Sequence, residues 1–206
     1  FSFWKKSTNT YKLEAFRSDG ARLWERDLGW SIELGIWYSP YVVFDFNGDG
    51  KAEVAVKTGE GDPRDAEGKV GSGPEWVCIL DGMTGKEITR APWPSRDGID
   101  EYNYFSRNQI GMAYLDGKTP CLILARGTYT LMKVEAWQLR GNALEPLWAW
   151  SSTEEGADHR KWRGQGAHSM HCVDVDGDGR DEVLLGSCAL DDNGMGLWTT
   201  GLGHPD

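Results

Sequence analysis

The sequence predicts an all-β protein, and more narrowly a β-propeller of which its 206 residues supply three to four blades. Two observations support this prediction. Residues 41–59 (YVVFDFNGDGKAEVAVKTG) and 171–187 (HCVDVDGDGRDEVLLGS) are close copies, and each reads as a strand, an Asp-rich loop and a strand. A second kind of segment, made of two strands and a tight glycine turn, alternates with them. Short strands with Gly- and Asp-rich turns at a fixed repeat are typical of propeller blades.

These two kinds of segment alternate along the chain. No long stretch of the sequence has helical periodicity. In chain order, we expect hairpins and loop-bearing strand pairs at residues 15–24, 41–59, 78–88, 111–127, 136–148 and 171–187. The pair at 111–127 (GMAYLDGKTPCLILARG) has the same outline with a shortened loop. Its anchor, Asp116, lies 71 residues after Asp45 and 58 residues before Asp174, and the turn glycines Gly20, Gly82 and Gly141 are 62 and 59 residues apart. Both kinds of segment therefore recur at about 60 residues.

A propeller needs about four to eight blades to close its ring, and an unclosed stack leaves strand edges bare. We therefore expect the chain to be an interior part of a longer protein, with residues 1–206 forming one partial propeller domain. A β-sandwich is the alternative architecture for this pattern of strands.

Composition excludes several classes of function. The formal net charge of −10 argues against nucleic acid as a partner. No apolar run is long enough for a transmembrane helix, so we expect no membrane insertion. The four cysteines form no Cys-x-x-Cys pair, which argues against zinc and redox motifs. We expect buried free thiols, with one disulfide as the alternative. Eleven tryptophans are a mild indication of carbohydrate binding.

Two loops, at residues 45–53 and 174–182, have the pattern of calcium sites. Side-chain oxygens stand at positions 1, 3, 5 and 9, and the position-7 carbonyl completes an oxygen-rich set of ligands for a hard divalent ion. The predicted ligands are Asp45, Asn47, Asp49, Lys51 and Glu53 in the first loop, and Asp174, Asp176, Asp178, Arg180 and Glu182 in the second. The alternative is a polar hairpin turn without metal. An EF-hand is excluded because the flanking segments read as strands.

A second group of candidate ligands lies near the C-terminus, in GQGAH (164–168) and GLGHPD (201–206). His168, His204 and Asp206 could close on one ion. By ligand chemistry alone, two imidazoles and a carboxylate suit Zn, Fe or Mn better than calcium. The alternative is a pair of turn histidines that are hydrogen-bonded to the backbone.

Taken together, these motifs resemble polysaccharide lyase family 11, the bacterial rhamnogalacturonan lyases. The resemblance spans residues 15–206 and is carried by DFNGDGKAEVAVKTG, SGPEW, LDGMTGKE, AYLDGKTP, RGTYT, VEAWQL, GQGAH, DVDGDGRDEV and DDNGMGLWTTGLGHPD, in that order. Where the family has glycine between the histidine and the aspartate of the last motif, this chain has Pro205. Proline fixes φ and removes an N–H group from that loop.

The resemblance implies an eight-bladed propeller with several calcium ions. It implies a secreted or extracellular enzyme that cleaves the rhamnose–galacturonate backbone of pectin by β-elimination. It also implies that the positions of His168, His204 and Asp206 bind calcium, together with a further acidic ligand from the next blade. The alternative function is a non-catalytic, integrin-like calcium-binding propeller that binds glycans or proteins without cutting them.

β-Elimination needs a base that reaches C5 of galacturonate and an acid near the leaving oxygen. The basic or phenolic residues near motif loops are Lys57, Arg126, Tyr129, Lys133, Arg163 and His171. Of these, Arg126 and Tyr129 are our candidates for lining the substrate groove, because they follow the shortened loop. The alternative for each is an ordinary surface or strand residue.

Overall fold

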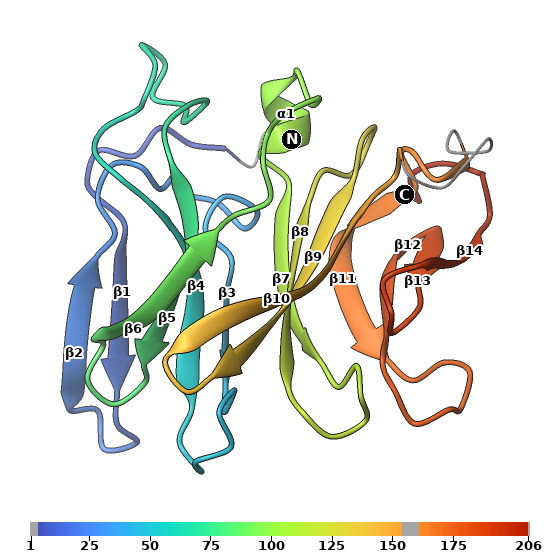
Figure 1. Cartoon of the computed structure of the whole chain (residues 1–206). Coiled ribbons are helices and arrows are strands. Elements are labelled where there is room, and N and C mark those ends of the chain that lie inside the picture. Colours follow the sequence, from blue (N-terminus) through green and yellow to red (C-terminus); the bar gives the residue numbers. More distant parts are fainter. Residues whose placement is uncertain (1–3, 154–160, 206) are drawn as a thin grey trace. The chain divides into compact units, whose positions relative to one another are not determined.

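The computed structural model describes residues 4–153 and 161–205 of the chain. The chain divides into two compact units. The first comprises residues 1–93 with 141–143, and the second comprises residues 94–140 with 144–206. Both units are built from antiparallel sheets (Figure 1).

The first unit contains a hairpin and a four-stranded sheet. The hairpin joins β1 (Lys12–Phe16) and β2 (Arg22–Asp27). The sheet follows chain order, with β3 (Tyr41–Phe44), β4 (Glu53–Gly59), β5 (Glu75–Asp81) and β6 (Glu87–Pro92) side by side. Buried residues of β4 and β5 form a core with Leu28 and Ile32, and Leu13 and Trp24 of the hairpin pack against it.

The second unit contains two four-stranded sheets that also follow chain order. The first of them joins β7 (Asn108–Ala113), β8 (Cys121–Arg126), β9 (Lys133–Arg140) and β10 (Ala143–Ser151). The second joins β11 (Gly166–Val173), β12 (Glu182–Gly186), β13 (Cys188–Leu190) and β14 (Gly196–Thr199). One continuous core lies between these sheets, with Ile123 and Val134 on one side and Val183 and Leu190 on the other.

These observations confirm the all-β prediction. The one helix of the described residues, α1 (Tyr102–Phe105), is a single turn. No sheet closes on itself in the described part of the chain, so the propeller remains a prediction. No described helix is long and apolar enough to cross a membrane. All four cysteines are free thiols, and three of them are buried, as expected from the sequence.

Strand register places the Asp-rich loops at equivalent points of two sheets. The first loop joins β3 to β4, and the second joins β11 to β12. Phe44 pairs with Glu53, and Val173 pairs with Glu182. In each loop the position-9 glutamate therefore lies opposite the residue that precedes the position-1 aspartate, which turns its side chain back beneath the loop.

Candidate metal centres

The first Asp-rich loop is organised around Asp45. The Asp45 carboxylate accepts hydrogen bonds from the backbone N–H groups of Gly48 and Gly50, at 2.7 and 2.9 Å. Asp49 Oδ1 accepts the N–H of Lys51 at 2.8 Å, which holds the second half of the turn. Glu53 is buried, and its Oε2 accepts the N–H of Phe46 at 2.9 Å. Carboxylates bonded in this way are held in position before any ion arrives.

The second loop repeats this arrangement almost atom for atom. Asp174 accepts the N–H groups of Gly177 and Gly179, at 2.7 and 3.0 Å. Glu182 has no exposed surface, and its Oε2 accepts the N–H of Val175 at 2.7 Å. The other oxygen, Glu182 Oε1, is buried without a hydrogen-bond partner. A buried, unpaired carboxylate oxygen is costly, and an ion or a donor at that point would remove the cost.

The donor set of the second loop fits a divalent cation. One oxygen each from Asp174, Asp176 and Glu182 lie within 4.8 Å of one another. Calcium holds oxygens at about 2.3–2.6 Å, so ligands on opposite sides of one ion are about 4.6–5.2 Å apart. In addition, burial raises the pKa of Glu182, and the nearby aspartates raise it further. A bound cation would reverse this effect by stabilising the ionised form.

Glu53 shows the same behaviour in the first loop. Burial raises its pKa, and the charges of Asp49 and Asp45 raise it further. Asn47 replaces the acidic residue that stands at the same position in the second loop, and its side-chain N–H donates to Glu53 Oε1 at 3.2 Å. The first loop therefore gathers less negative charge than the second. The predicted carbonyl ligands at Lys51 and Arg180 remain predictions.

The shortened third loop is satisfied without metal. The Asp116 carboxylate accepts the N–H groups of Lys118 and Thr119, at 2.9 and 2.6 Å, and the Thr119 hydroxyl, at 2.8 Å. These bonds lower the pKa of Asp116, with the Thr119 N–H as the largest cause. All donors come from the turn itself, which makes Asp116 a turn-forming residue.

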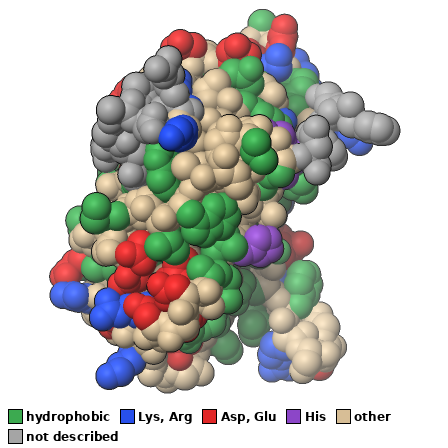
Figure 2. Space-filling view, turned by 90° about the vertical axis from the view of Figure 1, so that its right-hand side faces the viewer, with side chains coloured by type: hydrophobic (Ala, Val, Ile, Leu, Met, Phe, Trp, Pro, Cys, Tyr) green, Lys and Arg blue, Asp and Glu red, His purple; other side chains and the backbone are tan. Residues whose placement is uncertain are grey.

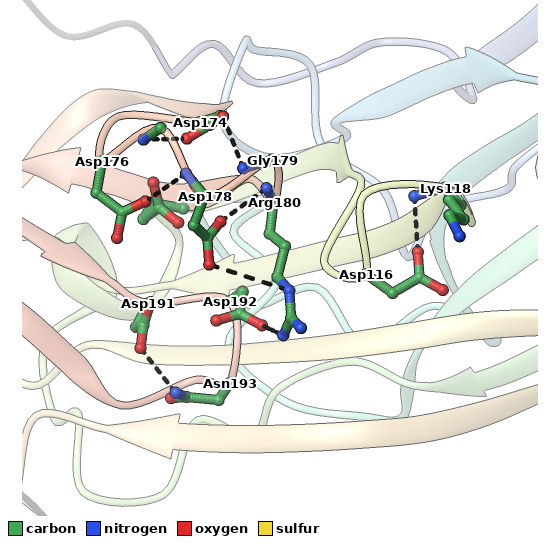
Figure 3. Close-up of polar contacts among 12 residues, drawn as sticks. Asp116, Lys118, Asp174, Asp176, Asp178, Gly179, Arg180, Asp191, Asp192 and Asn193 are labelled. Carbon is green, nitrogen blue, oxygen red and sulfur yellow. Dashed lines mark hydrogen bonds and ion pairs between the residues drawn. The ribbon is translucent and has the colours of Figure 1, made fainter.

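The second loop also makes contacts that the sequence did not predict, and Figure 3 shows one of them, the ion pair of Arg180 with Asp192. Asp181 Oδ2 accepts the N–H of Tyr114 at 2.7 Å, and the Asp181 N–H donates to the Tyr114 carbonyl at 3.1 Å. Arg180 extends from the loop to Asp192, at 2.7 Å. The loop therefore links two adjacent sheets of the second unit. Only the three-dimensional structure brings Asp181 and Tyr114 together, because they come from different sheets.

His168 and His204 are brought together as the sequence predicted. Their ring centroids are 4.9 Å apart, and the Tyr129 ring lies 4.8 Å from that of His204. The Tyr129 hydroxyl is 2.7 Å from His168 Nε2. His204 Nδ1 lies 2.5 Å from the Gly166 carbonyl, so it carries the hydrogen, and Nε2 is the nitrogen that could accept a metal ion. Asp206, the third predicted ligand, lies outside the described residues.

Tyr129 and Arg126, the two groove candidates, have different environments. Tyr129 is half-buried beside the histidine pair, with the Arg107 guanidinium 5.6 Å from its ring centre. Arg126 is 1% exposed, and its guanidinium donates to the carbonyls of Pro94 (2.6 Å) and Phe105. A side chain in that location supports the backbone and does not line a groove, because the carbonyls that it binds also enclose it.

The remaining basic candidates are mostly committed to internal contacts. Lys57 forms a buried ion pair with Glu75, at 2.6 Å. Lys133 donates to Ser95 Oγ and to the Asp97 carbonyl, both at 2.8 Å. His171 is exposed and lies 3.2 Å from Ser169 Oγ.

Comparison with known proteins identifies the family. A family model described as the C-terminal domain of rhamnogalacturonan lyase family 11 matches residues 4–206. The chain is 39% identical to rhamnogalacturonan endolyase YesW of Bacillus subtilis (strain 168), over 97% of this chain and 35% of YesW. It is 38% identical to rhamnogalacturonan exolyase YesX of the same organism, over 97% of this chain and 36% of YesX.

Solved structures of such proteins have the same fold as this chain. The exotype rhamnogalacturonan lyase YesX matches with a TM-score of 0.92 at 37% identity, over 100% of this chain and 37% of that one. A Bacillus licheniformis rhamnogalacturonan lyase matches with a TM-score of 0.91 at 39% identity, over 97% of this chain and 37% of that one. This chain thus spans little more than a third of the length of these relatives, and it belongs to rhamnogalacturonan lyase family 11.

Proposed function

We propose that the chain is part of a calcium-dependent rhamnogalacturonan lyase that cleaves the rhamnose–galacturonate backbone of pectin by β-elimination. The observation that carries this proposal is the family match over residues 4–206, because the curated relatives that it resembles are named as rhamnogalacturonan lyases. The relatives include an endolyase and an exolyase at nearly equal identity. The identity values therefore favour neither mode of action.

The histidine pair is the part of this chain that we assign to the chemistry. His168 and His204 face each other beside the Tyr129 hydroxyl, and His204 is oriented by its bond to Gly166. A calcium ion held there would neutralise the uronate carboxylate, so that charge can build up as the C5 proton leaves. Histidine nitrogens are unusual ligands for calcium, so acidic ligands beyond the described residues must supply most of the oxygens.

Tyr129 is our candidate for a residue that serves this site. Its hydroxyl lies within hydrogen-bond distance of His168, which fixes the orientation of that ring. Partners that hold a metal-ligating histidine have a strong effect on activity when they are removed. We therefore assign Tyr129 a positioning role and assign Arg126 to the support of the backbone.

The two Asp-rich loops have a different role in this proposal. Each joins the first two strands of a sheet, and each contains a buried glutamate whose pKa is raised by burial. We propose that calcium in these loops stabilises the fold and takes no part in the reaction. Calcium affinities of about 10⁻⁴–10⁻³ M, as in other extracellular modules, would suit a secreted enzyme.

We also propose that the complete protein is a β-propeller. Three four-stranded antiparallel sheets, each in chain order, support this architecture. The sheets of the second unit pack face to face around one core, as neighbouring blades do. The eight blades implied by the family resemblance would require a chain longer than the one described, in line with the length of the relatives.

The proposal is tested by incubating the full-length protein with rhamnogalacturonan and, separately, with homogalacturonan. The ultraviolet absorbance of the unsaturated uronide reports β-elimination. We expect a rise with rhamnogalacturonan that a chelator abolishes and that calcium restores. If folded, calcium-loaded protein produced no rise with either polymer, the non-catalytic binding propeller would be the better account.

A further inference from the structure

Gln165, in the middle of the GQGAH motif, is a buried polar residue next to the histidine pair. It directly precedes β11 and stands three residues before His168. Its exposed fraction is 2%, so it is shielded from solvent and from any polysaccharide at the surface. A buried amide needs hydrogen-bond partners for both its oxygen and its nitrogen. The partners of Gln165 therefore show which segments it holds in place.

The Gln165 side chain joins the loop that carries His204 to the segment that leads to His168. Its Oε1 accepts the N–H of Gly203, the residue before His204, at 3.2 Å. Its Nε2 donates to the carbonyl of Arg163 at 3.1 Å. Gln165 and Gly203 are 38 positions apart in the chain. One buried side chain thus connects the two segments from which the histidines come.

The loop at residues 201–205, which carries His204, has few other anchors. Two N–H groups at its start bond to threonine hydroxyls of the same turn, at 3.3 and 3.2 Å. Pro205 has no N–H group to donate. Among the described residues, the loop makes two hydrogen bonds to another part of the chain. One is the bond to the Gln165 side chain, and the other joins His204 Nδ1 to the Gly166 carbonyl.

The main chain on either side of this glutamine is fixed against the loop that carries Tyr129. The N–H of Gly164 donates to the Thr130 carbonyl at 2.7 Å. The N–H of Gly166 donates to the Thr128 carbonyl at 3.2 Å. A Cβ atom on Gly166 would lie 2.9 Å from Thr128 Cα, so the two segments lie too close for a side chain there. The glutamine therefore extends from a backbone that is itself held beside Tyr129.

The histidines, in contrast to the glutamine, are accessible. His168 is exposed and His204 is half-buried. Histidine side chains also reach the surface on the face that Figure 2 presents. Because Gln165 is enclosed, it can influence a ligand at this site only through the histidines that it holds.

We propose that Gln165 is a positioning residue of the histidine site, and that it holds His204 beside His168 so that both rings can face one calcium ion. Without the Gln165 bond, the His204 loop would keep a single hydrogen bond to another segment, and its ring would move more freely. Removing a partner that holds a metal ligand lowers metal affinity by about ten- to hundred-fold. The inference rests on the calcium site proposed at this histidine pair, and it names the residue that sets the affinity of that site.

The test replaces Gln165 by methionine in the full-length protein. Methionine has a similar length but can make neither of the two amide hydrogen bonds. Hydrogen–deuterium exchange, read by mass spectrometry, reports on peptides that cover residues 201–204. Without calcium, we expect these residues to exchange faster in Gln165→Met than in the parent, whereas residues 174–182 should exchange at the same rate. In a calcium titration, the concentration that half-protects residues 201–204 should rise about ten-fold.

Two further variants separate positioning from a general loss of stability. Gln138→Met removes another buried glutamine of the same unit, whose Oε1 accepts Arg140 Nε–H at 2.8 Å. It should leave the exchange of residues 201–204, and their protection by calcium, unchanged. Gln165→Glu keeps an oxygen for the Gly203 N–H, so it should restore much of the protection that Gln165→Met loses.

The exchange measurement needs no substrate, so it decides the inference even if the full-length protein cleaves no rhamnogalacturonan. In active protein, the calcium concentration for half-maximal release of unsaturated uronide should also rise about ten-fold in Gln165→Met. The inference would be overturned if Gln165→Met and the parent exchanged alike at residues 201–204, or if the same calcium concentration half-protected both. A parent protein in which calcium gave these residues no protection would overturn it as well.

Discussion

Replacing Glu182 by glutamine tests two effects on stability separately. One is the free-energy cost of burying its charge, and the other is the stabilisation that it gives as a calcium ligand. Glu182 has no exposed surface, and one of its carboxylate oxygens has no hydrogen-bond partner. Glutamine keeps an oxygen for the Val175 N–H but removes the charge. Without calcium, Glu182→Gln should therefore be at least as stable as the parent protein, because an uncompensated buried charge is removed.

The free energy by which calcium stabilises the folded protein follows from the affinity expected of such loops. A site with a Kd of about 0.1 mM, in about 1 mM calcium, stabilises the folded state by about 1.4 kcal/mol. For a chain of this size, that is a rise of about 3–6 °C in the unfolding midpoint per site. The parent protein should gain this amount from each of two loops. Glu53→Gln or Glu182→Gln should lose about half of the gain, and the double variant should lose nearly all of it.

The assay is thermal unfolding followed by circular dichroism, in chelator and in calcium. Glu67→Gln is the matched control, because the Glu67 side chain is 69% exposed and lies outside both loops. Its calcium-dependent rise should equal that of the parent. The reasoning would be refuted if Glu182→Gln kept the full calcium-dependent rise, or if its midpoint fell in chelator as much as in calcium.

Three further predictions follow from other contacts. Arg126→Ala should lower the free energy of unfolding by about 3 kcal/mol in urea titrations, because it leaves two enclosed carbonyls without donors; an unchanged midpoint would contradict this assignment. Tyr129→Phe keeps the ring beside His204 but loses the bond to His168, so it should reduce kcat/KM of the full-length enzyme about ten-fold without changing its unfolding midpoint. Asp116→Asn should be less stable than the parent at pH 7. This difference should shrink as the pH falls below 3.8, the ordinary pKa of that carboxyl, and disappear below its lowered pKa in the folded state. The folded state lowers the Asp116 pKa, so its stabilisation is lost on protonation; a difference that persists in acid would contradict this.

Much of the local structure could be predicted from the sequence because it depends on residues that are close together in the chain. The strand–loop–strand segments follow from the short apolar runs on either side of each loop and from the position of glycine in the loops. The rings of His168 and His204 lie close together, as the two motifs suggested and the family resemblance implied. Their role as metal ligands remains a prediction.

Contacts between repeats could not be predicted from one sequence. Arg126 follows a motif loop and looks like a groove residue, but its strand β8 is buried along its whole length, and its guanidinium is enclosed by the carbonyls of Pro94 and Phe105. Likewise, nothing in the order of residues pairs Asp181 with Tyr114, or places Trp148 on Gly194. These contacts depend on how one sheet packs on the next, and that geometry appears only when the chain is folded.

The most direct test of the account compares two histidines of one strand, β11, in the full-length protein. His168→Ala removes a member of the pair that we assign to the reaction, whereas His171→Ala removes a histidine whose bond is to Ser169. With rhamnogalacturonan and saturating calcium, we predict that His168→Ala forms almost no unsaturated uronide while it keeps the calcium-dependent rise in unfolding midpoint that the two Asp-rich loops contribute. We predict that His171→Ala retains the parent rate. A His168→Ala protein that cleaved the polymer as fast as the parent would contradict the central claim.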